Sequence, residues 1–178
     1  MHKEVLSFWF EEIEPKRWWV ADPDFDRQIK ARFLLVTTQA TQGELSHWRK
    51  DPKGRLAEII VLDQFSRNIF RNTPTAFTHD PMALVLAQEA VAAGVQESLS
   101  TTECGFLLMP FMHSESKQIH VEAESLFREL ASPHSYQFEQ KHKAIIDRFG
   151  HYPHRNEILG RVSTAEEIDF LKQPGSSF

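Results

Sequence analysis

The stretch Ile59–Arg71, IIVLDQFSRNIFR, limits the possible folds of this 178-residue chain more than any other. Placed on a helix at 100° per residue, its apolar residues fall on one broad side and its polar residues on the other. Leu56 and Ile60 lie in the polar arc, so the helix begins apolar all round. Such helices are usually buried, and the polar stripe should therefore open into a cavity or groove. The stripe consists of Asp63, Gln64, Arg67, Asn68 and Arg71.

Signals that begin and end helices recur along the whole chain. Asp-Pro pairs at 22, 51 and 80 are typical helix starts, and Ser100 with Glu103 has the spacing of a capping box. No segment alternates β-branched residues with period two. The chain is therefore predicted to be all-α. The expected helices cover about residues 5–10, 23–43, 52–72, 81–94, 100–112, 119–130, 133–150, 156–160 and 163–171.

The connections between these helices favour antiparallel neighbours, stacked as pairs in one domain over residues 1–178. Pro110 lies inside a predicted helix and should kink or end it. Ser163 with Glu166 has the spacing of a cap for the last helix. The constant step of 29 between the Asp-Pro pairs carries no further sequence similarity, so it is interpreted as three helix starts, although stacked repeats remain compatible with it.

Composition excludes several classes of function. The net charge is −5 and no Lys/Arg-rich run is present, which disfavours a nucleic-acid surface, although a local arginine cluster stays possible. No stretch approaches the roughly 18 apolar residues of a membrane span. The single Cys104 removes any internal disulfide framework and fits a reducing compartment. We therefore expect a cytoplasmic protein.

Asp63 and Arg67 stand four residues apart and can form an ion pair. On an exposed helix this pair would contribute little. If the stripe is enclosed, however, an unpaired charge there would be costly. Arg67 and Arg71 outnumber the one carboxylate of the stripe, so positive charge would remain for an anionic guest or for another carboxylate of the chain.

Three further groups carry side chains suited to chemistry. In Pro110–Glu115, PFMHSE, His113 could act as an acid or base and Glu115 could orient it, although the segment also fits a simple turn between helices. His142 follows an apolar helix stripe, where a histidine is more often a hydrogen-bonded core residue. The turn 149–156, FGHYPHRN, offers His154, Arg155 and Asn156 at a helix N-terminus, which favours anions.

His151 and His154 have HxxH spacing, but this spacing alone is a weak sign of metal binding. The sequence contains no HExxH, GxSxG, GxxxxGK[ST], GxGxxG or CxxC motif. Cys104 lies in an apolar helix, where a reactive thiolate is disfavoured. Neither a metal nor a cofactor is predicted.

Four segments together resemble the bacterial domain-of-unknown-function family 924 over essentially the whole chain: LDQFSRNIFRNTPTAF, PFMHSES, FGHYPHRNEILGRVSTAEEIDFL and PGSSF. The resemblance implies a tetratricopeptide-like α-superhelix and brings no established activity. The family pattern more often has Arg where this chain has His151, which weakens a metal site. The segment SKQIHV also departs from it. The motif positions include Asp63, Gln64, Arg67, Asn68, Arg71, His113, Ser114, Glu115, His142, His154, Arg155 and Asn156.

The leading hypothesis is binding of an anionic or carboxylate-bearing small molecule or peptide segment in a pocket that gathers these groups. The C-terminal PGSSF, with its own carboxylate, is one possible guest. The alternative is a hydrolase- or lyase-like enzyme, with His113 or His142 as general base and Glu115 or Asp63 orienting it. A third interpretation is a scaffold whose polar stripe only fixes helix register. The sequence predicts no oligomeric state.

Overall fold

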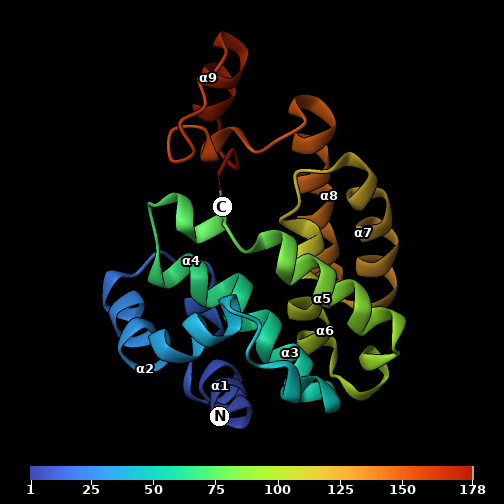
Figure 1. The fold of residues 1–178 in the computed structure, drawn as a ribbon. Coiled ribbons are helices and arrows are strands. Elements are labelled where there is room, and N and C mark those ends of the chain that lie inside the picture. Colours follow the sequence, from blue (N-terminus) through green and yellow to red (C-terminus); the bar gives the residue numbers. More distant parts are fainter. Residues whose placement is uncertain (178) are drawn as a thin grey trace.

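The computed structural model describes residues 1–177 (Figure 1), and this part of the chain contains helices but no strands. The all-α prediction is thus confirmed, while the tetratricopeptide-like superhelix remains a prediction. The N-terminal half comprises α1 (His2–Ser7), η1 (Phe8–Glu12), η2 (Pro15–Trp19), α2 (Pro23–Thr41), η3 (Ser46–Lys50), α3 (Pro52–Ile60), η4 (Val61–Phe65) and α4 (Ser66–Ile69). The C-terminal half comprises η5 (Pro74–Phe77), α5 (Asp80–Ala92), η6 (Val95–Ser98), α6 (Thr101–Met112), α7 (Lys117–Leu130), α8 (Pro133–Phe149), η7 (Pro153–Arg155) and α9 (Ala165–Leu171).

Aromatic rings form the centre of the N-terminal half. Phe33 of α2 lies between Phe8 and Phe65, with 4.9 Å between ring centroids on each side. Trp9 meets both Phe65 and Phe106 edge-on, each with 5.6 Å between centroids. These contacts bind the first helix, α2, the central helix and α6 into one buried core.

The central helix is not a regular α-helix along its whole length. α3 continues directly into η4, a π-helical turn, and then into α4. Every residue of η4 is buried, and Leu56 and Ile60 before it have no exposed surface. The predicted enclosure of the polar stripe is therefore confirmed where it begins. The π turn holds Asp63 and Gln64, and such turns often occur at functional sites.

Helix ends follow the sequence signals closely, with two corrections. Ser100 and Glu103 form the predicted capping box, but the cap of α9 is Thr164 with Glu167 rather than Ser163 with Glu166. Pro110 lies inside α6, which continues to Met112. The predicted short helix at 156–160 is wrong, because the helical residues there are Pro153–Arg155 and a turn follows.

The C-terminal helices are arranged as neighbours in chain order. α6 packs against α5 and α7, and α7 packs against α8. Beyond α8 the chain turns at Gly150, whose φ of 76° favours glycine. α9 lies at the upper end of Figure 1 and contacts the end of α8 through the rings of Phe170 and Phe149. Ile145, Ile146 and Tyr152 form a second, small core there.

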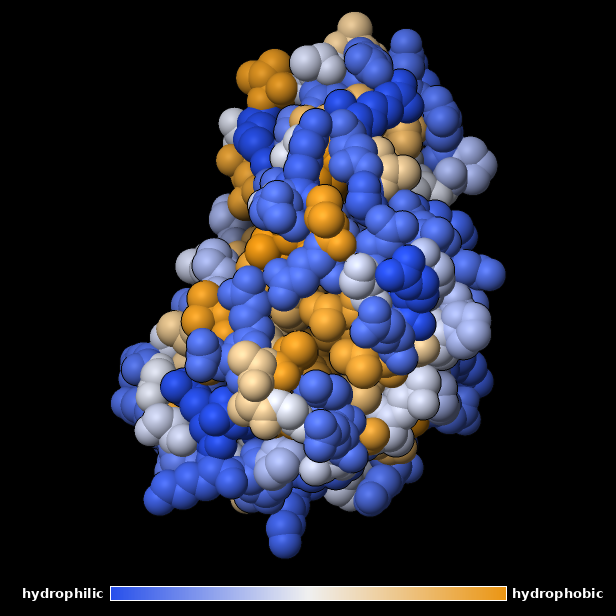
Figure 2. Space-filling model, turned by 90° about the vertical axis from the view of Figure 1, so that its right-hand side faces the viewer, coloured by the Kyte–Doolittle hydropathy of each residue, from blue (hydrophilic) through white to orange (hydrophobic). Residues whose placement is uncertain are grey.

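Apolar side chains are exposed on one face of the molecule. Figure 2 shows one face, on which apolar side chains gather in the middle and hydrophilic ones surround them. Within residues 1–177, no helix combines the length and the apolar character needed to span a membrane.

Candidate functional site

Asp63 is the buried centre of the site. Its Oδ1 lies 2.7 Å from His113 Nδ1 and 3.1 Å from Arg67 Nη1, and its Oδ2 accepts a hydrogen bond from Gln64 Nε2 at 2.5 Å. Burial alone would raise the pKa of this carboxyl, but the Arg67 guanidinium and His113 reverse the effect and lower it. Asp63 is therefore an ionised, fully satisfied acceptor, and the predicted ion pair with Arg67 is confirmed.

Arg67 joins two carboxylates from different elements. Besides Asp63, it donates to both oxygens of Asp80 at the start of α5, each at 2.9 Å. Burial would lower the pKa of the guanidinium, but the two carboxylates raise it. This fork fixes the second half of the central helix against α5.

Glu115 binds the turn after α8. Its two oxygens accept from Arg161 at 2.7 and 3.0 Å, and its Oε1 also accepts from the Tyr152 backbone N–H at 2.9 Å. Burial opposes ionisation, but Arg161 and that N–H together lower the pKa of Glu115. Glu115 therefore has its acceptors occupied, and it contacts Arg161 rather than His113.

Arg155 has the least complete set of partners among these charged groups. Its guanidinium lies between the rings of Phe77 and Tyr152, 4.7 and 4.6 Å from their centroids. Only 6 % of its side chain is exposed, and its carboxylate neighbours Asp80 and Glu115 lie 3.5 and 3.9 Å away, beyond good hydrogen-bond distance. Its Nη2 donates to the His113 carbonyl at 3.1 Å, and its Nε has no hydrogen-bond partner among the described residues.

Burial and the nearby Arg67 lower the pKa of Arg155, against the opposing effect of Asp80 and Glu115. An arginine stays protonated under such conditions. The positive charge of Arg155 is therefore buried without a hydrogen-bonded carboxylate, and the more distant Asp80 and Glu115 stabilise it only in part.

A cavity of about 380 Å³ opens beside these groups. It lies between η5, α5, the end of α6 and the turn around η7. One part of its wall is apolar and the other is polar. The lining residues are Pro74, Phe77, Thr78, Asp80, Pro81, Leu84, Pro110, His113, Ser114, Glu115, Arg155 and Leu159.

Several predicted site residues do not line this cavity. Asn68 and Arg71 both bind Asp26 of α2, Asn68 at 2.8 Å and Arg71 at 2.5 and 2.8 Å. This carboxylate was not identified from the sequence. The Asn156 amide donates to Ser163 Oγ at 3.1 Å. These contacts join elements of the fold, so the three residues have structural partners.

Two further candidate histidines, His142 and His154, contact Tyr152. His142 donates from Nδ1 to the Phe138 carbonyl at 2.8 Å, and its ring packs on Tyr152. Burial lowers the pKa of His142 to about 3 and that of His154 to about 4. The His154 ring packs against Tyr152 in a tilted arrangement, with 5.6 Å between ring centroids. Both imidazoles are neutral near pH 7, and neither lines the cavity.

The HxxH pair is divided between different partners. His151 Nε2 lies 2.5 Å from Glu167 Oε1 on α9, whereas His154 packs against Tyr152. Among residues 1–177, no three side chains of the ligating types are grouped as a metal site. The predicted docking of the C-terminal carboxylate concerns Phe178, which lies outside the described residues.

Asp80, Tyr152 and Arg161 belong to the site but were not identified as site residues from the sequence. Asp80 was interpreted as a helix cap because Pro81 follows it. The N-cap of α5 is His79, however, and the Asp80 side chain binds Arg67. Tyr152 donates from its hydroxyl to the Met112 carbonyl at 2.5 Å. The excess of arginine over acid in the central stripe was the available signal that such a carboxylate must exist.

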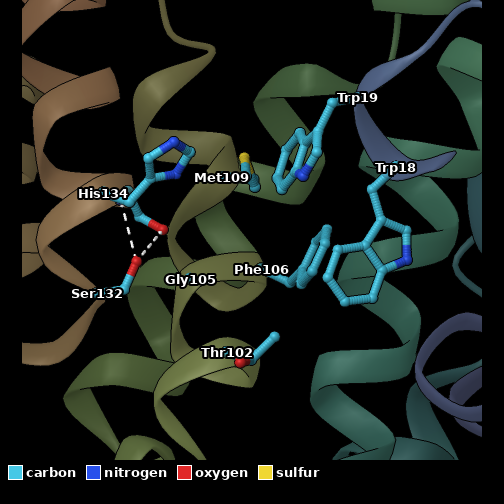
Figure 3. A pocket seen from close by; sticks show the side chains of 9 residues that line it. Trp18, Trp19, Thr102, Gly105, Phe106, Met109, Ser132 and His134 are labelled. Carbon is cyan, nitrogen blue, oxygen red and sulfur yellow. Dashed lines mark hydrogen bonds between the residues drawn. The ribbon is translucent and has the colours of Figure 1, made fainter. Parts of the chain in front are cut away.

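A second hollow, of about 160 Å³, lies between η2, α6 and the start of α8. Figure 3 shows the rings of Trp18, Trp19 and Phe106 on one side, with Ser132 and His134 on the other. The planes of Trp19 and Phe106 are nearly parallel, at 8°. Among the described residues that line this hollow, no buried side-chain polar atom lacks a hydrogen-bond partner.

The comparisons with known proteins identify the family. The model of a bacterial protein family of unknown function, DUF924, matches residues 5–175. The chain belongs to this family. A solved structure of a protein of unknown function from Agrobacterium tumefaciens is similar over 96 % of each chain, with 33 % sequence identity and a TM-score of 0.91. The comparison with curated proteins gave no match.

Proposed function

We propose that this DUF924 protein binds a small molecule bearing a carboxylate, and that Arg155 receives this carboxylate in the cavity of about 380 Å³. The observation that carries the proposal is the guanidinium of Arg155, buried at the cavity wall without a hydrogen-bonded carboxylate. A buried polar group left unpaired typically costs about 1–3 kcal/mol. A ligand that completes its pairing would recover this free energy.

The sign of the guest's charge follows from the pairing of the other groups. Asp80 accepts two bonds from Arg67, and Glu115 accepts two from Arg161. The formal charges around the cavity nearly cancel, so the net charge of the wall favours neither an anionic nor a cationic ligand. Hydrogen bonding favours an anion, because the incompletely paired charged group is Arg155, a cation that can donate hydrogen bonds.

The apolar part of the wall indicates the remainder of the guest. Phe77, Leu84 and Leu159 face the cavity together with three prolines. Binding pockets typically combine such apolar surface with a few polar groups that fix orientation. A carboxylate carried on a small apolar or aromatic group fits this division better than a fully charged metabolite or a long peptide.

Isothermal titration with phenylacetate tests the proposal, with phenylacetamide and phenethylamine as neutral and cationic analogues. We expect the acid to bind the wild-type protein, and the Arg155→Gln variant to lose at least about tenfold in affinity, the scale of one hydrogen bond to a charged group. Arg71→Gln is the matched control, since Arg71 pairs with Asp26 instead of lining the cavity. Tighter binding of the amine, or unchanged acid binding in Arg155→Gln, would contradict the proposal.

The Asp63–His113 contact favours a second candidate, a hydrolase- or lyase-like enzyme. A carboxylate 2.7 Å from Nδ1 is the arrangement that orients a histidine as general base, and His113 lines the cavity. His142 is the weaker candidate base, because burial lowers its pKa to about 3 and its Nδ1 binds a backbone carbonyl.

A panel of generic ester, phosphoester and amide substrates discriminates this candidate, run on the wild-type protein beside His113→Ala. Catalysis by His113 predicts activity that the substitution abolishes. Activity equal in both proteins would show that His113 has no part in it.

We also propose a cytoplasmic location. The support is compositional: Cys104 is the single cysteine of the chain, so no internal disulfide can form, which fits a reducing compartment. Labelling of the protein in fractionated cells of its own host tests the location.

A further inference from the structure

The protonation pattern of His113 is set by its neighbour. Asp63 is ionised and can only accept hydrogen bonds. Because Asp63 Oδ1 lies 2.7 Å from His113 Nδ1, the proton must be on Nδ1. Burial and Arg67 lower the pKa of His113 despite the opposing effect of Asp63, so the imidazole is neutral near pH 7. In a neutral imidazole with Nδ1 protonated, Nε2 carries a lone pair and accepts hydrogen bonds.

This acceptor belongs to a residue of the cavity wall. His113 is a lining residue, and its Nε2 forms no hydrogen bond with other residues in the part of the chain that the structure describes. The carboxylates of Asp80 and Glu115, by contrast, already accept from Arg67 and Arg161. A hydroxyl on the guest would therefore find its best acceptor at His113.

The cation and the acceptor are close enough to bind one small molecule. Arg155 Nη2 donates to the backbone carbonyl of His113 itself at 3.1 Å, and both residues line the same cavity. One small guest can therefore present a carboxylate to Arg155 and a hydroxyl to His113.

We infer that the cavity selects hydroxycarboxylates, with the carboxylate on Arg155, a hydroxyl on the adjacent or next carbon donating to His113 Nε2, and an apolar remainder against Phe77 and Leu84. This inference rests on the proposed function and specifies its ligand class. Asp63 acts as the positioning residue, because it holds His113 in the tautomer that accepts.

Matched acids test the selectivity. Mandelate and phenylacetate differ only in the 2-hydroxyl, so their affinities by isothermal titration isolate it. We expect the wild-type protein to bind mandelate about tenfold more tightly, the scale of one net hydrogen bond. His113→Phe should bind both acids equally, because it keeps an aromatic ring and removes the acceptor. Arg155→Gln should weaken binding of both.

The outcomes separate this inference from the proposed function. Equal affinity of the two acids for the wild-type protein overturns the hydroxyl selectivity and leaves carboxylate binding intact. Failure of both acids to bind overturns both. If His113→Phe still binds mandelate more tightly than phenylacetate, another group accepts the hydrogen bond of the hydroxyl, and the role of His113 is overturned.

A measurement on the unmodified protein guards against a variant that fails to fold. Long-range ¹H–¹⁵N correlation spectra distinguish the two histidine nitrogens and their protonation. We expect His113 at pH 7 to show a protonated Nδ1 and an unprotonated Nε2, and the Nε2 resonance to shift on addition of mandelate more than on addition of phenylacetate. A protonated Nε2 in the free protein would overturn the inference.

Discussion

Asp80 shows how one residue acquires a role that its local sequence conceals. Its position before Pro81 is typical of a helix cap, yet its carboxylate binds Arg67, thirteen residues earlier, at 2.9 Å through both oxygens. It also lies 3.5 Å from Arg155. A single carboxylate thus partly neutralises two buried guanidinium groups, one from the central helix and one from the turn after α8.

Replacing Asp80 by Asn should destabilise the protein by about 1–3 kcal/mol, because Arg67 loses its bidentate partner in a site with little access to solvent. Urea unfolding followed by far-UV circular dichroism measures the change. Asp169→Asn is the control, since Asp169 is largely exposed and its pair with Lys172 should contribute little. Equal stability of the two variants would show that the Asp80 contacts contribute nothing.

His142 should make the protein sensitive to acid. Burial lowers its pKa to about 3, whereas in the unfolded chain it is about 6.5. Between these values the unfolded chain binds a proton that the folded protein does not. Stability is therefore fully present above pH 6.5 and is lost as the pH falls, by up to about 1.4 kcal/mol per pH unit.

The His142→Asn variant retains a donor for the Phe138 carbonyl and removes this titration. We expect its free energy of unfolding to fall less than that of the wild-type protein between pH 7 and pH 5, by about 2 kcal/mol. Urea titrations at four pH values in this interval give the comparison. Parallel pH curves for the two proteins would contradict the expectation.

At the scale of elements, helix starts were predictable and helix partners were not. Pro23, Pro52 and Pro133 stand at the first position of α2, α3 and α8, because proline and the preceding cap act within a few residues of each other. The π turn at 61–65 left no such local signal. The partners of Asn68 and Arg71 on α2 depend on packing between segments more than 40 residues apart.

The join between η3 and α3 should tolerate no side chain at Gly54. A Cβ there would overlap the backbone carbonyl of Trp48, which cannot move away as a flexible side chain could. We expect Gly54→Ala to destabilise the protein by about 1–3 kcal/mol through this overlap. Thermal unfolding followed by calorimetry gives the measurement.

Gly105 on α6 provides the matched control for Gly54. A Cβ at Gly105 would lie 3.7 Å from Ser135 Oγ, an ordinary contact. Because alanine is favoured over glycine in a helix by roughly 0.5–1 kcal/mol, Gly105→Ala should leave stability unchanged or raise it. If both substitutions destabilise equally, the cause is not the approach of Trp48.

At the scale of the whole molecule, the candidate site lies where distant segments of the chain meet. His113 is the C-cap of α6, Asp63 belongs to the central helix and Arg155 follows α8. The sequence predicted that arginines and histidines of these segments would gather, because an enclosed charged stripe needs partners. Apart from the Asp63–Arg67 ion pair, it did not predict which charges are already paired, since that depends on side-chain distances of a few ångströms.

The two cores of the molecule differ greatly in size. Cys104–Met112 of α6 is buried throughout within the large core, whereas α9 contributes one buried residue, Glu167, and rests on the small core through Phe170. Segments with few buried apolar contacts open locally at lower free energy than the global unfolding. α9 should therefore open independently of the remaining helices.

Hydrogen exchange followed by mass spectrometry tests this gradient. Corrected for intrinsic rates, amides of α9 should exchange at least about a hundredfold faster than those of α6, which corresponds to a difference in opening free energy of about 2.7 kcal/mol or more. α7 is the control, because its apolar face packs between α6 and α8 and should remain protected.

Because Arg161 lies before α9 and binds Glu115 at the cavity, a bound acid should slow exchange around residue 161 more than in α9 itself. Equal protection of α6 and α9 would show that the C-terminal helix unfolds only with the whole molecule, and the small core would then be part of a single cooperative unit.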